Sequence, residues 1–340
     1  MAPALEDVQH SVLITTIHGL HEAPNFLATA VSTAARHTTE SLQIVIISSL
    51  FNPPAGTHNA PGISRIAHWD DVQRLLTFVY VQATKVAQDV GRILLNVDVL
   101  LRGTAEAFPE QVLEGAARIY SVTPHDSSVP LPSCLEARRA EIVALPPDDH
   151  PLHHPLPPPS TAADPTDPPL LPVVALGGTF DHLHAGHKIL LSMGAWLARD
   201  KLIVGVTGTS HDALLAGKQH RAVLEPLAVR AARTRAFCTL FKPALAYDVV
   251  PIVDVYGPTG WDPNVQGLVV SKETLPGAAS IDERRAALAL PPLRTFVIDV
   301  ISATEASVDA EDAAVLKTAK MSSTYIREWI VKQQQGTSTT

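Results

Sequence analysis

This chain of 340 residues contains few cysteines and few aromatic residues, and it has no excess of positive charge. The two cysteines, Cys134 and Cys238, match no metal or redox spacing, so we expect two reduced thiols rather than a disulfide framework or a zinc site. The net charge of -8 at pH 7 argues against a nucleic-acid partner, which would require a basic face. No apolar run approaches the ~20 residues that a membrane helix needs, so no membrane association is expected.

Other features of the composition narrow the cellular setting. Residues 1–7 carry acidic side chains and no basic n-region, so we expect neither a signal peptide nor a transit peptide. Hydrophobic residues make up 46 % of the chain and charged ones 18 %, which excludes global disorder and allows a sizeable core. We therefore expect a cytoplasmic protein of two domains, and entry into the nucleus is left open.

The first part of the chain, residues 1–144, predicts a smaller α/β domain. The expected strands cover 11–17, 42–47 and 93–100. Helical spacing covers 24–36 and a longer stretch that runs from Asp70, the expected N-cap, to Gly91. No phosphate-binding loop, metal-ligand spacing or nucleophile motif occurs in this sequence, so it predicts no role for the domain.

Residues 145–171 predict an extended, proline-rich linker between the two domains. The prolines, among them the run 157–159, remove backbone donors and stiffen the chain toward polyproline II. His150, His153 and His154 have no cysteine or second framed pair beside them, which favours solvated linker residues over a metal site. A partner that binds proline-rich segments is the alternative to a simple spacer.

Residues 172–340 predict a doubly wound, Rossmann-like parallel sheet of five strands. The expected strands cover 173–176, 202–207, 252–256, 267–271 and 296–301. Helical segments separate them, and the spacing of the first two strands fits a right-handed βαβ crossover. The helix expected at 224–241 carries several arginines, most of which should by default form a solvated face.

The stretch 177–188 organises this second domain. Its two leading glycines permit a sharp turn and the close approach of a ligand, and a helix begins after Gly186. A helix N-terminus at the carboxyl end of a parallel strand is where such sheets bind phosphate. His184 and His187 are three residues apart at this helix start, so they project from the same side and indicate an anion site.

A second motif lies near the end of the chain, at 320–327. Ser322 or Ser323 can cap the helix that follows, because a hydroxyl accepts hydrogen bonds from the N–H groups of the first turn. The same N–H groups and hydroxyls can instead receive phosphate oxygens. Both alternatives remain open from the residues alone.

The first motif carries a resemblance to a known family. His184-Ala185-Gly186-His187 resembles the (His/Thr)-x-Gly-His motif of the nucleotidyltransferase superfamily. The whole stretch 177–188 looks like the corresponding segment of eukaryotic, fungal-type phosphopantetheine adenylyltransferases.

Two further segments extend this resemblance. Met321-Ser322-Ser323-Thr324 and Arg327 resemble the Ile-Ser-Ser-Thr-x-x-Arg motif of the superfamily, with Met in place of Ile. The segment 269–274 is similar to a Val-Val-Ser-Glu-Glu-Thr segment of the eukaryotic enzymes, with Lys272 in place of a Glu. The resemblance covers residues 172–334 and leaves the N-terminal half unexplained.

The resemblance implies transfer of AMP from ATP to 4′-phosphopantetheine, which gives dephospho-coenzyme A and pyrophosphate. The alternatives are a related enzyme, either a nicotinamide-nucleotide adenylyltransferase or a cytidylyltransferase, and a non-catalytic scaffold of the coenzyme A pathway. Mg²⁺ would accompany ATP without dedicated protein ligands. No Gly-x-x-x-x-Gly-Lys-(Ser/Thr) loop occurs, so dephospho-coenzyme A kinase is expected as a separate partner, beside other enzymes of the pathway.

The resemblance also assigns site residues. Catalysis is expected from His184, His187 and Lys218, where Lys218 is either a mobile cation between phosphates or an ordinary surface lysine. ATP binding is expected from Gly177, Gly178, His184, Gly186, His187, Ser322, Ser323, Thr324 and Arg327. Binding of 4′-phosphopantetheine is expected from Thr179, Phe180, Lys218, Ser271 and Thr274.

Overall fold

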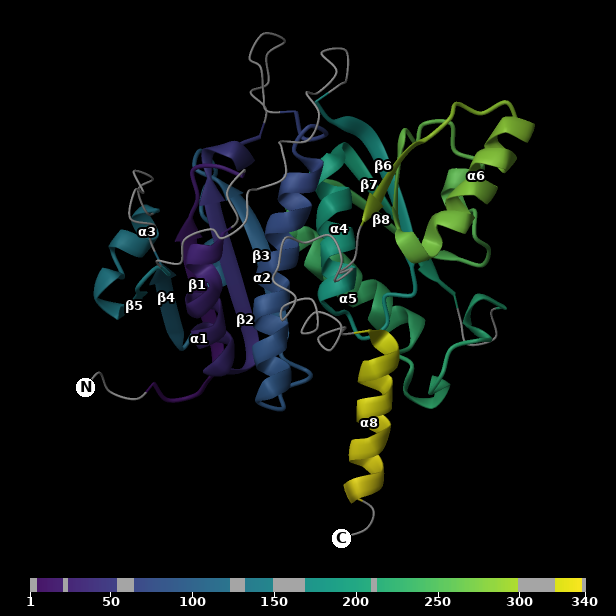
Figure 1. The fold of residues 1–340 in the computed structure, drawn as a ribbon. Coiled ribbons are helices and arrows are strands. Elements are labelled where there is room, and N and C mark those ends of the chain that lie inside the picture. The colour runs from purple at the N-terminus through teal and green to yellow at the C-terminus, as the bar shows by residue number, and fades with distance from the viewer. Residues whose placement is uncertain are drawn as a thin grey trace. The chain divides into compact units, whose positions relative to one another are not determined.

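The structure, a computed structural model, describes residues 5–20, 24–53, 64–122, 132–148, 169–208, 213–298 and 322–337. These residues form two compact units, one at each end of the predicted linker, and each is built on a five-stranded sheet (Figure 1). Within the described segments no helix has the length and apolar character needed to cross a bilayer. Both cysteines are free, and burial raises the pKa of the Cys238 thiol to about 12.

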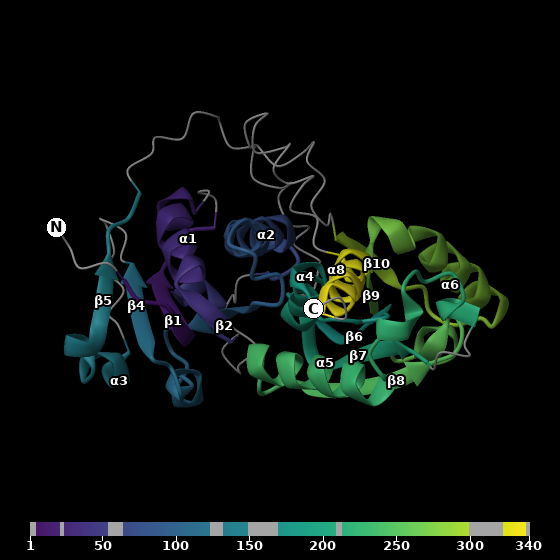
Figure 2. The same cartoon turned by 90° about the horizontal axis from the view of Figure 1, so that it is seen from below.

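The N-terminal unit is a parallel sheet with the strand order β3-β2-β1-β4-β5. Its strands are β1 (Val8–Thr16), β2 (Thr38–Ser48), β3 (Asn96–Gly103), β4 (Arg118–Val122) and β5 (Ile142–Leu145). Its helices are α1 (Ala28–Arg36), α2 (Trp69–Asp89) and the short α3 (Ser133–Glu136). The first two helices lie side by side over one face of the sheet (Figure 2).

The three strands and two helices predicted in this unit are all present, with corrected ends. The third strand begins at Asn96 rather than three residues earlier. Asp70 is not the N-cap of α2; His68 holds that position, and Asp70 lies in the first turn, where a carboxylate complements the helix dipole. The strands β4 and β5 were not predicted, because runs of five and four residues are too short to show a clear period.

The C-terminal unit confirms the predicted doubly wound sheet, with five parallel strands in the order β10-β9-β6-β7-β8. Its strands are β6 (Leu171–Gly178), β7 (Ala198–Thr207), β8 (Ala246–Ile252), β9 (Gly267–Ser271) and β10 (Arg294–Ile298). Its helices are α4 (Ala185–Leu197), α5 (Leu227–Phe241), α6 (Leu275–Ala287) and α8 (Ser323–Thr337). The predicted end of the fifth strand, 299–301, lies outside the described residues.

The third strand of this unit was predicted too late in the chain. It ends at Ile252, and Val253 beyond it is 75 % exposed, so the β-branched residues there do not pair in the sheet. The carboxylate of Asp254 accepts hydrogen bonds from the N–H of Tyr256 and of Gly257, which turns the chain away. A proline within a run of residues argues against a strand, so Pro251 led the prediction away from this segment. The structure accommodates Pro251 because β8 is an edge strand, where one backbone N–H can be absent.

Helix α4 packs closely on β6 and β7 near its C-terminal end, at Gly194. A Cβ atom at Gly194 would lie 2.5 Å from Cδ2 of Leu176 and 3.1 Å from Cδ1 of Leu202. An alanine at this position would force the two leucine side chains to shift.

We expect Gly194→Ala to lower the free energy of unfolding of the C-terminal unit. Overpacking a close contact of this kind costs about 1–3 kcal/mol, more than the roughly 1 kcal/mol that alanine gains in helix propensity. Urea denaturation followed by circular dichroism measures the difference. Gly217→Ala is the matched control, since nothing lies within 4 Å of its Cβ position. A Gly194→Ala protein as stable as the wild type would contradict this packing argument.

Candidate active site

The candidate site lies where the strand order of the C-terminal sheet reverses. Successive strands run outward from β6 in one direction and from β9 in the other, and these two strands are neighbours. Ligands of doubly wound sheets bind outside the carboxyl ends of the strands at this reversal. Gly178 ends β6 and Ser271 ends β9, so both predicted site residues lie at that edge.

Gly177 and Gly178, at the end of β6, do not form the sharp turn that the sequence predicted. Both belong to the strand, and neither has a positive φ. A Cβ at Gly178 would lie 3.1 Å from the ring of Phe180, so the missing side chain leaves room for that ring. The turn itself is made by Phe180 and His182, whose φ angles of 51° and 44° are in the left-handed region. Non-glycine residues adopt this backbone only where the surroundings enforce it.

A buried ion pair provides that enforcement. Asp181, with no exposed surface, accepts a hydrogen bond of 2.5 Å from Nη1 of Arg327 on α8. Its other carboxylate oxygen accepts from the N–H of Glu225 at 2.8 Å, and its carbonyl accepts from Oγ of Ser323 at 2.9 Å. The loop between β6 and α4 is thus fastened to the first turns of α8, which Figure 1 shows in yellow.

Arg230 of α5 adds a second set of ties to the same loop. Its guanidinium, 1 % exposed, donates to the carbonyls of Thr179, Thr207 and Gly208 at 2.7–2.9 Å, and Nε donates to the carbonyl of Glu225. The carbonyls at the ends of β6 and β7 are therefore held by one side chain. The default prediction of a solvated face is wrong for this arginine, because it is committed to the loop and not to solvent.

His184 and His187 lie together at the start of α4. His184 is the N-cap, and its ring stacks on that of His187 with centroids 3.9 Å apart and an interplanar angle of 27°. The ring of Phe180 packs against His187 at 5.3 Å. The Nδ1 atoms of both histidines are buried without a hydrogen-bond partner, and a neutral imidazole carries one N–H in either tautomer. Each ring can then donate one N–H to an anion at the helix N-terminus.

Both imidazoles are neutral at physiological pH. Desolvation lowers the pKa of His184 to about 3, helped by the positive charges of Lys188 and Arg327. Desolvation, followed by the electrostatic coupling to the neighbouring His184 and by the positive charge of Lys218, lowers the pKa of His187 well below its ordinary value. The surroundings of the pair are therefore electropositive, as an anion site requires, although the rings themselves carry no charge.

This shift predicts how the stability of the C-terminal unit depends on pH. The pKa of His184 is about 3 when folded and 6.5 when exposed, so between these values the unfolded chain binds more protons than the folded one. The free energy of unfolding is therefore expected to fall as the pH is lowered from 6.5 toward 3. Urea denaturation at several pH values measures the slope. His184→Gln should reduce the slope, and an unchanged slope would contradict the assignment.

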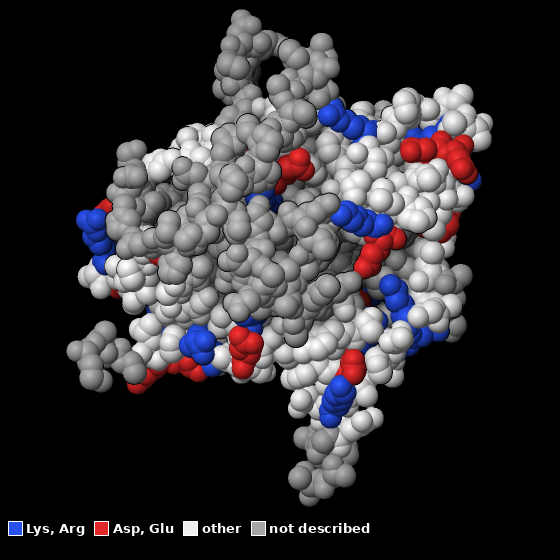
Figure 3. Space-filling model, viewed as in Figure 1, with Lys and Arg blue, Asp and Glu red and all other residues white. Residues whose placement is uncertain are grey.

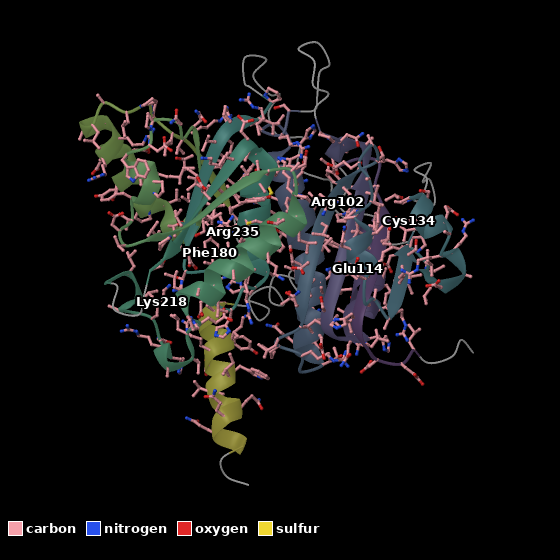
Figure 4. All side chains as sticks on the ribbon, turned by 180° about the vertical axis from the view of Figure 1, so that it is seen from behind. Arg102, Glu114, Cys134, Phe180, Lys218 and Arg235 are labelled. Atoms are coloured by element: carbon pink, nitrogen blue, oxygen red, sulfur yellow. The ribbon has the colours of Figure 1, made fainter. Side chains whose placement is uncertain are left out.

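Lys218 lies on the segment between the 3₁₀ helices η5 (Ala213–Leu215) and η6 (Arg221–Val223), and its side chain is exposed. Figure 4 labels it together with Phe180 of the loop that follows β6. Its charge contributes to the lowered pKa of His187, so the ammonium group acts electrostatically on the histidine pair. Its exposure agrees equally with the predicted mobile cation and with an ordinary surface lysine, so both alternatives stay predictions.

The second motif forms the start of α8. Ser322 accepts a hydrogen bond from the N–H of Tyr325 through Oγ at 3.2 Å, so the predicted capping by this residue is confirmed. Ser323 contacts the carbonyl of Asp181, and Thr324 accepts from Nη2 of Arg327 at 3.2 Å. The N–H groups of Ser323 and Thr324 precede the first helical hydrogen bond, and the binding of phosphate by them stays a prediction.

The remaining predicted residues, Ser271, Thr274 and Arg327, form hydrogen bonds within the C-terminal unit. Ser271 and Thr274 form a capping box with each other, in which the N–H of Ser271 donates to Oγ1 of Thr274 at 3.0 Å. Arg327, predicted to bind ATP, is 1 % exposed and also donates to the carbonyl of Gln219. Its guanidinium holds the loop in this structure, and phosphate binding by it stays a prediction.

The buried residues that support the loop and the helix start at the site were not identified from the sequence. Asp181 stands inside the first motif, and its position beside two histidines was the available signal. Glu225 accepts from the N–H of His182 at 2.8 Å, and Lys188, 2 % exposed, places Nζ 5.6 Å from the ring centroid of Phe237. No sequence pattern joins these residues, because their partners are far away in the chain. Among the described residues, no group of three or more histidine, cysteine, aspartate or glutamate side chains can hold a metal.

Comparison with known proteins places this site in context. A phosphopantetheine adenylyltransferase of Saccharomyces cerevisiae is 39 % identical over 167 residues, which are 49 % of this chain and 51 % of the yeast protein. One of Pyrobaculum aerophilum is 38 % identical over 128 residues, which are 38 % of this chain and 79 % of the relative. The chain belongs to the phosphopantetheine adenylyltransferase family.

The match to this family is partial in length. The chain spans about half the length of the two yeast relatives it matches, of Saccharomyces cerevisiae and Schizosaccharomyces pombe. No protein-family model matches the chain. A crystal structure of an Archaeoglobus fulgidus protein of unknown function is 33 % identical over 37 % of this chain and 97 % of that chain. Its TM-score of 0.32 is too low to support a conclusion.

Proposed function

We propose that the chain transfers AMP from ATP to 4′-phosphopantetheine and releases pyrophosphate. The observation that carries the proposal is the stacked pair His184 and His187 at the N-terminus of α4, at the carboxyl end of β6. Two neutral N–H donors, free helix N–H groups and nearby positive charge suit a polyphosphate. Family membership agrees with this reaction.

The acceptor in this reaction needs no general base. The phosphate of 4′-phosphopantetheine is already an anion at neutral pH, so the protein has to align two anions and neutralise charge. The two histidines, with low pKa values, remain donors through the reaction rather than proton acceptors. The chemistry therefore depends on position and on electrostatic stabilisation.

The hydrogen-bond donors around the loop between β6 and α4 suggest where each phosphate group of ATP binds. His187 donates to the α-phosphate, and His184 stabilises the charge that grows there in the transition state. Ser323 and Thr324, at the start of α8, bind the β- and γ-phosphates, which leave as pyrophosphate. Lys218 moves between the phosphates. ATP enters as its Mg²⁺ complex, in which phosphate oxygens and water hold the ion.

The acceptor lies on the opposite side of the loop from the leaving group. Thr179 and Phe180 hold the phosphate of 4′-phosphopantetheine, and Ser271 and Thr274 at the end of β9 line the same side. The proposed cellular setting is the cytoplasm or the nucleus, with dephospho-coenzyme A kinase as the enzyme that takes up the product.

Assay of the full chain with MgATP tests the function directly. We expect dephospho-coenzyme A and pyrophosphate with 4′-phosphopantetheine as acceptor, and no product with nicotinamide mononucleotide. Replacement of ATP by CTP should also abolish the reaction. Product from nicotinamide mononucleotide or from CTP in place of these would overturn the proposal in favour of another nucleotidyltransferase.

A further inference from the structure

The two sheets of the chain have the same topology. In the N-terminal unit the first strand lies between the second and the fourth, and the third and fifth are the edges. The C-terminal unit repeats this order strand for strand, from β6 as its first strand to β10 as its fifth. In both units a helix joins the first strand to the second and another joins the second to the third.

The two units also share details that topology does not require. In each unit the second strand has one extra residue opposite the start of the first strand. This shift in register lies between Val8 and His10 of β1 and between Leu171 and Val173 of β6. The residue before the fourth strand, Ala117, donates its N–H to the carbonyl of His10 at 3.0 Å. In the C-terminal unit the corresponding N–H donates to the carbonyl of Val173, also at 3.0 Å.

This shared register aligns the site of the C-terminal unit with positions in the N-terminal unit. Gly177 pairs with Gly205, and the equivalent pair is Ile14 with Val45. Gly177 is exposed at the candidate site, whereas Ile14 and Val45 have no exposed surface. The backbone that glycine leaves open in one unit is covered by packed side chains in the other.

In the N-terminal unit, the helix that follows the first strand is α1, and it has no counterparts of His184 and His187. His184 is the N-cap of α4, and Leu27 is the N-cap of α1. Three residues further on, His187 corresponds to Ala30. The sequence His-x-Gly-His occurs once in the whole chain, so the N-terminal unit carries no copy of it.

The N-terminus of α1 is already occupied by an anion from the chain itself. Oδ2 of Asp148 accepts from the N–H of Thr29 at 2.7 Å, and Oδ1 accepts from Oγ1 of Thr29 at 2.5 Å. The N–H of Asp148 donates to the carbonyl of Phe26 at 3.1 Å. A carboxylate at this point satisfies the first-turn N–H and the helix dipole, as a phosphate would.

We propose that the N-terminal unit is a second, diverged copy of the nucleotidyltransferase fold, whose anion site is closed by Asp148. The chain then binds one MgATP, in the C-terminal unit, and the first unit contributes no transfer chemistry. This inference concerns the N-terminal half and does not depend on which acceptor the C-terminal unit uses.

Hydrogen exchange of the full chain, with and without MgATP, tests the number of nucleotide sites. We expect slower exchange in peptides from 185–197 and 323–335 and no change in peptides from 24–36. Slower exchange in 24–36 would overturn the inference. Protection in neither unit would overturn both the proposed function of the C-terminal unit and the binding of one MgATP, and the closure of the first unit would then depend on the Asp148 variants alone.

Asp148→Ala tests the closure itself. Loss of a helix cap should make the amides of 28–31 exchange about fivefold faster. Asp148→Asn keeps an acceptor oxygen and should show a smaller change. AMP transfer should stay at the wild-type rate in both variants. Unchanged exchange at 28–31 in Asp148→Ala would overturn the closure by this carboxylate.

Discussion

His187→Ala is expected to lower kcat for dephospho-coenzyme A formation by about two to three orders of magnitude. Burial lowers the pKa of the imidazole well below its ordinary value, so the ring is neutral and has one N–H to donate to the α-phosphate at the helix N-terminus. A donor that acts mainly in the transition state changes kcat more than KM. Steady-state assay with varied ATP separates the two constants.

The control for this experiment must remove a histidine without touching the site. His10, an exposed residue of β1 beside Glu40, meets this need, and His10→Ala should keep the wild-type rate. Circular dichroism should confirm that both variants fold. A His187→Ala enzyme within about threefold of wild type would exclude His187 as a transition-state donor, because such a loss is far below that of one preorganised donor.

Local signals in the sequence were enough to find the organising stretch. The strand predicted before Gly177 and the helix predicted after Gly186 follow from an apolar run and a change to helical period. The structure contains both, although the strand continues to Gly178 and the helix already begins at Ala185. The cap at Ser322 follows from a hydroxyl directly before a helical pattern. These features depend on neighbours in the chain, so composition and spacing determine them.

The support of the site could not be predicted in this way. The pair Asp181 and Arg327 joins residues that lie 146 apart, and Arg230 reaches carbonyls of two other strand ends. Whether an arginine meets solvent or a buried carbonyl depends on tertiary packing, and the sequence around it is similar in both cases. The duplicated topology was hidden for the same reason, because Ile14 and Gly177 correspond by register alone.

Asp181→Asn is expected to lower the free energy of unfolding of the C-terminal unit by about 3–5 kcal/mol. The substitution removes the charge that Arg327 faces, and both side chains are almost completely buried at 0 % and 1 % exposure. A buried guanidinium without its partner cannot regain water, so the cost exceeds that of losing one hydrogen bond. Urea denaturation measures it.

The matched control lies on the same helix. Glu328 and Lys332 form an exposed ion pair one turn apart on α8, the helix that protrudes at the bottom of Figure 3 with acidic and basic side chains next to each other. Glu328→Gln should change stability little, because solvent screens the pair. An effect of Asp181→Asn as small as this would contradict the buried pair.

A double substitution separates the cost of an unpaired charge from the value of the pair. In Asp181→Asn with Arg327→Met no buried charge remains, so the loss of stability should be clearly smaller than the sum of the two single losses. The double variant should nevertheless be slower in AMP transfer, because the side-chain tie between the loop and α8 is lost and only the hydrogen bond from Ser323 to the carbonyl of residue 181 still holds the left-handed backbone at Phe180 and His182. Additive losses of stability would mean that the two side chains act independently, and full activity would mean that the loop keeps its shape without them.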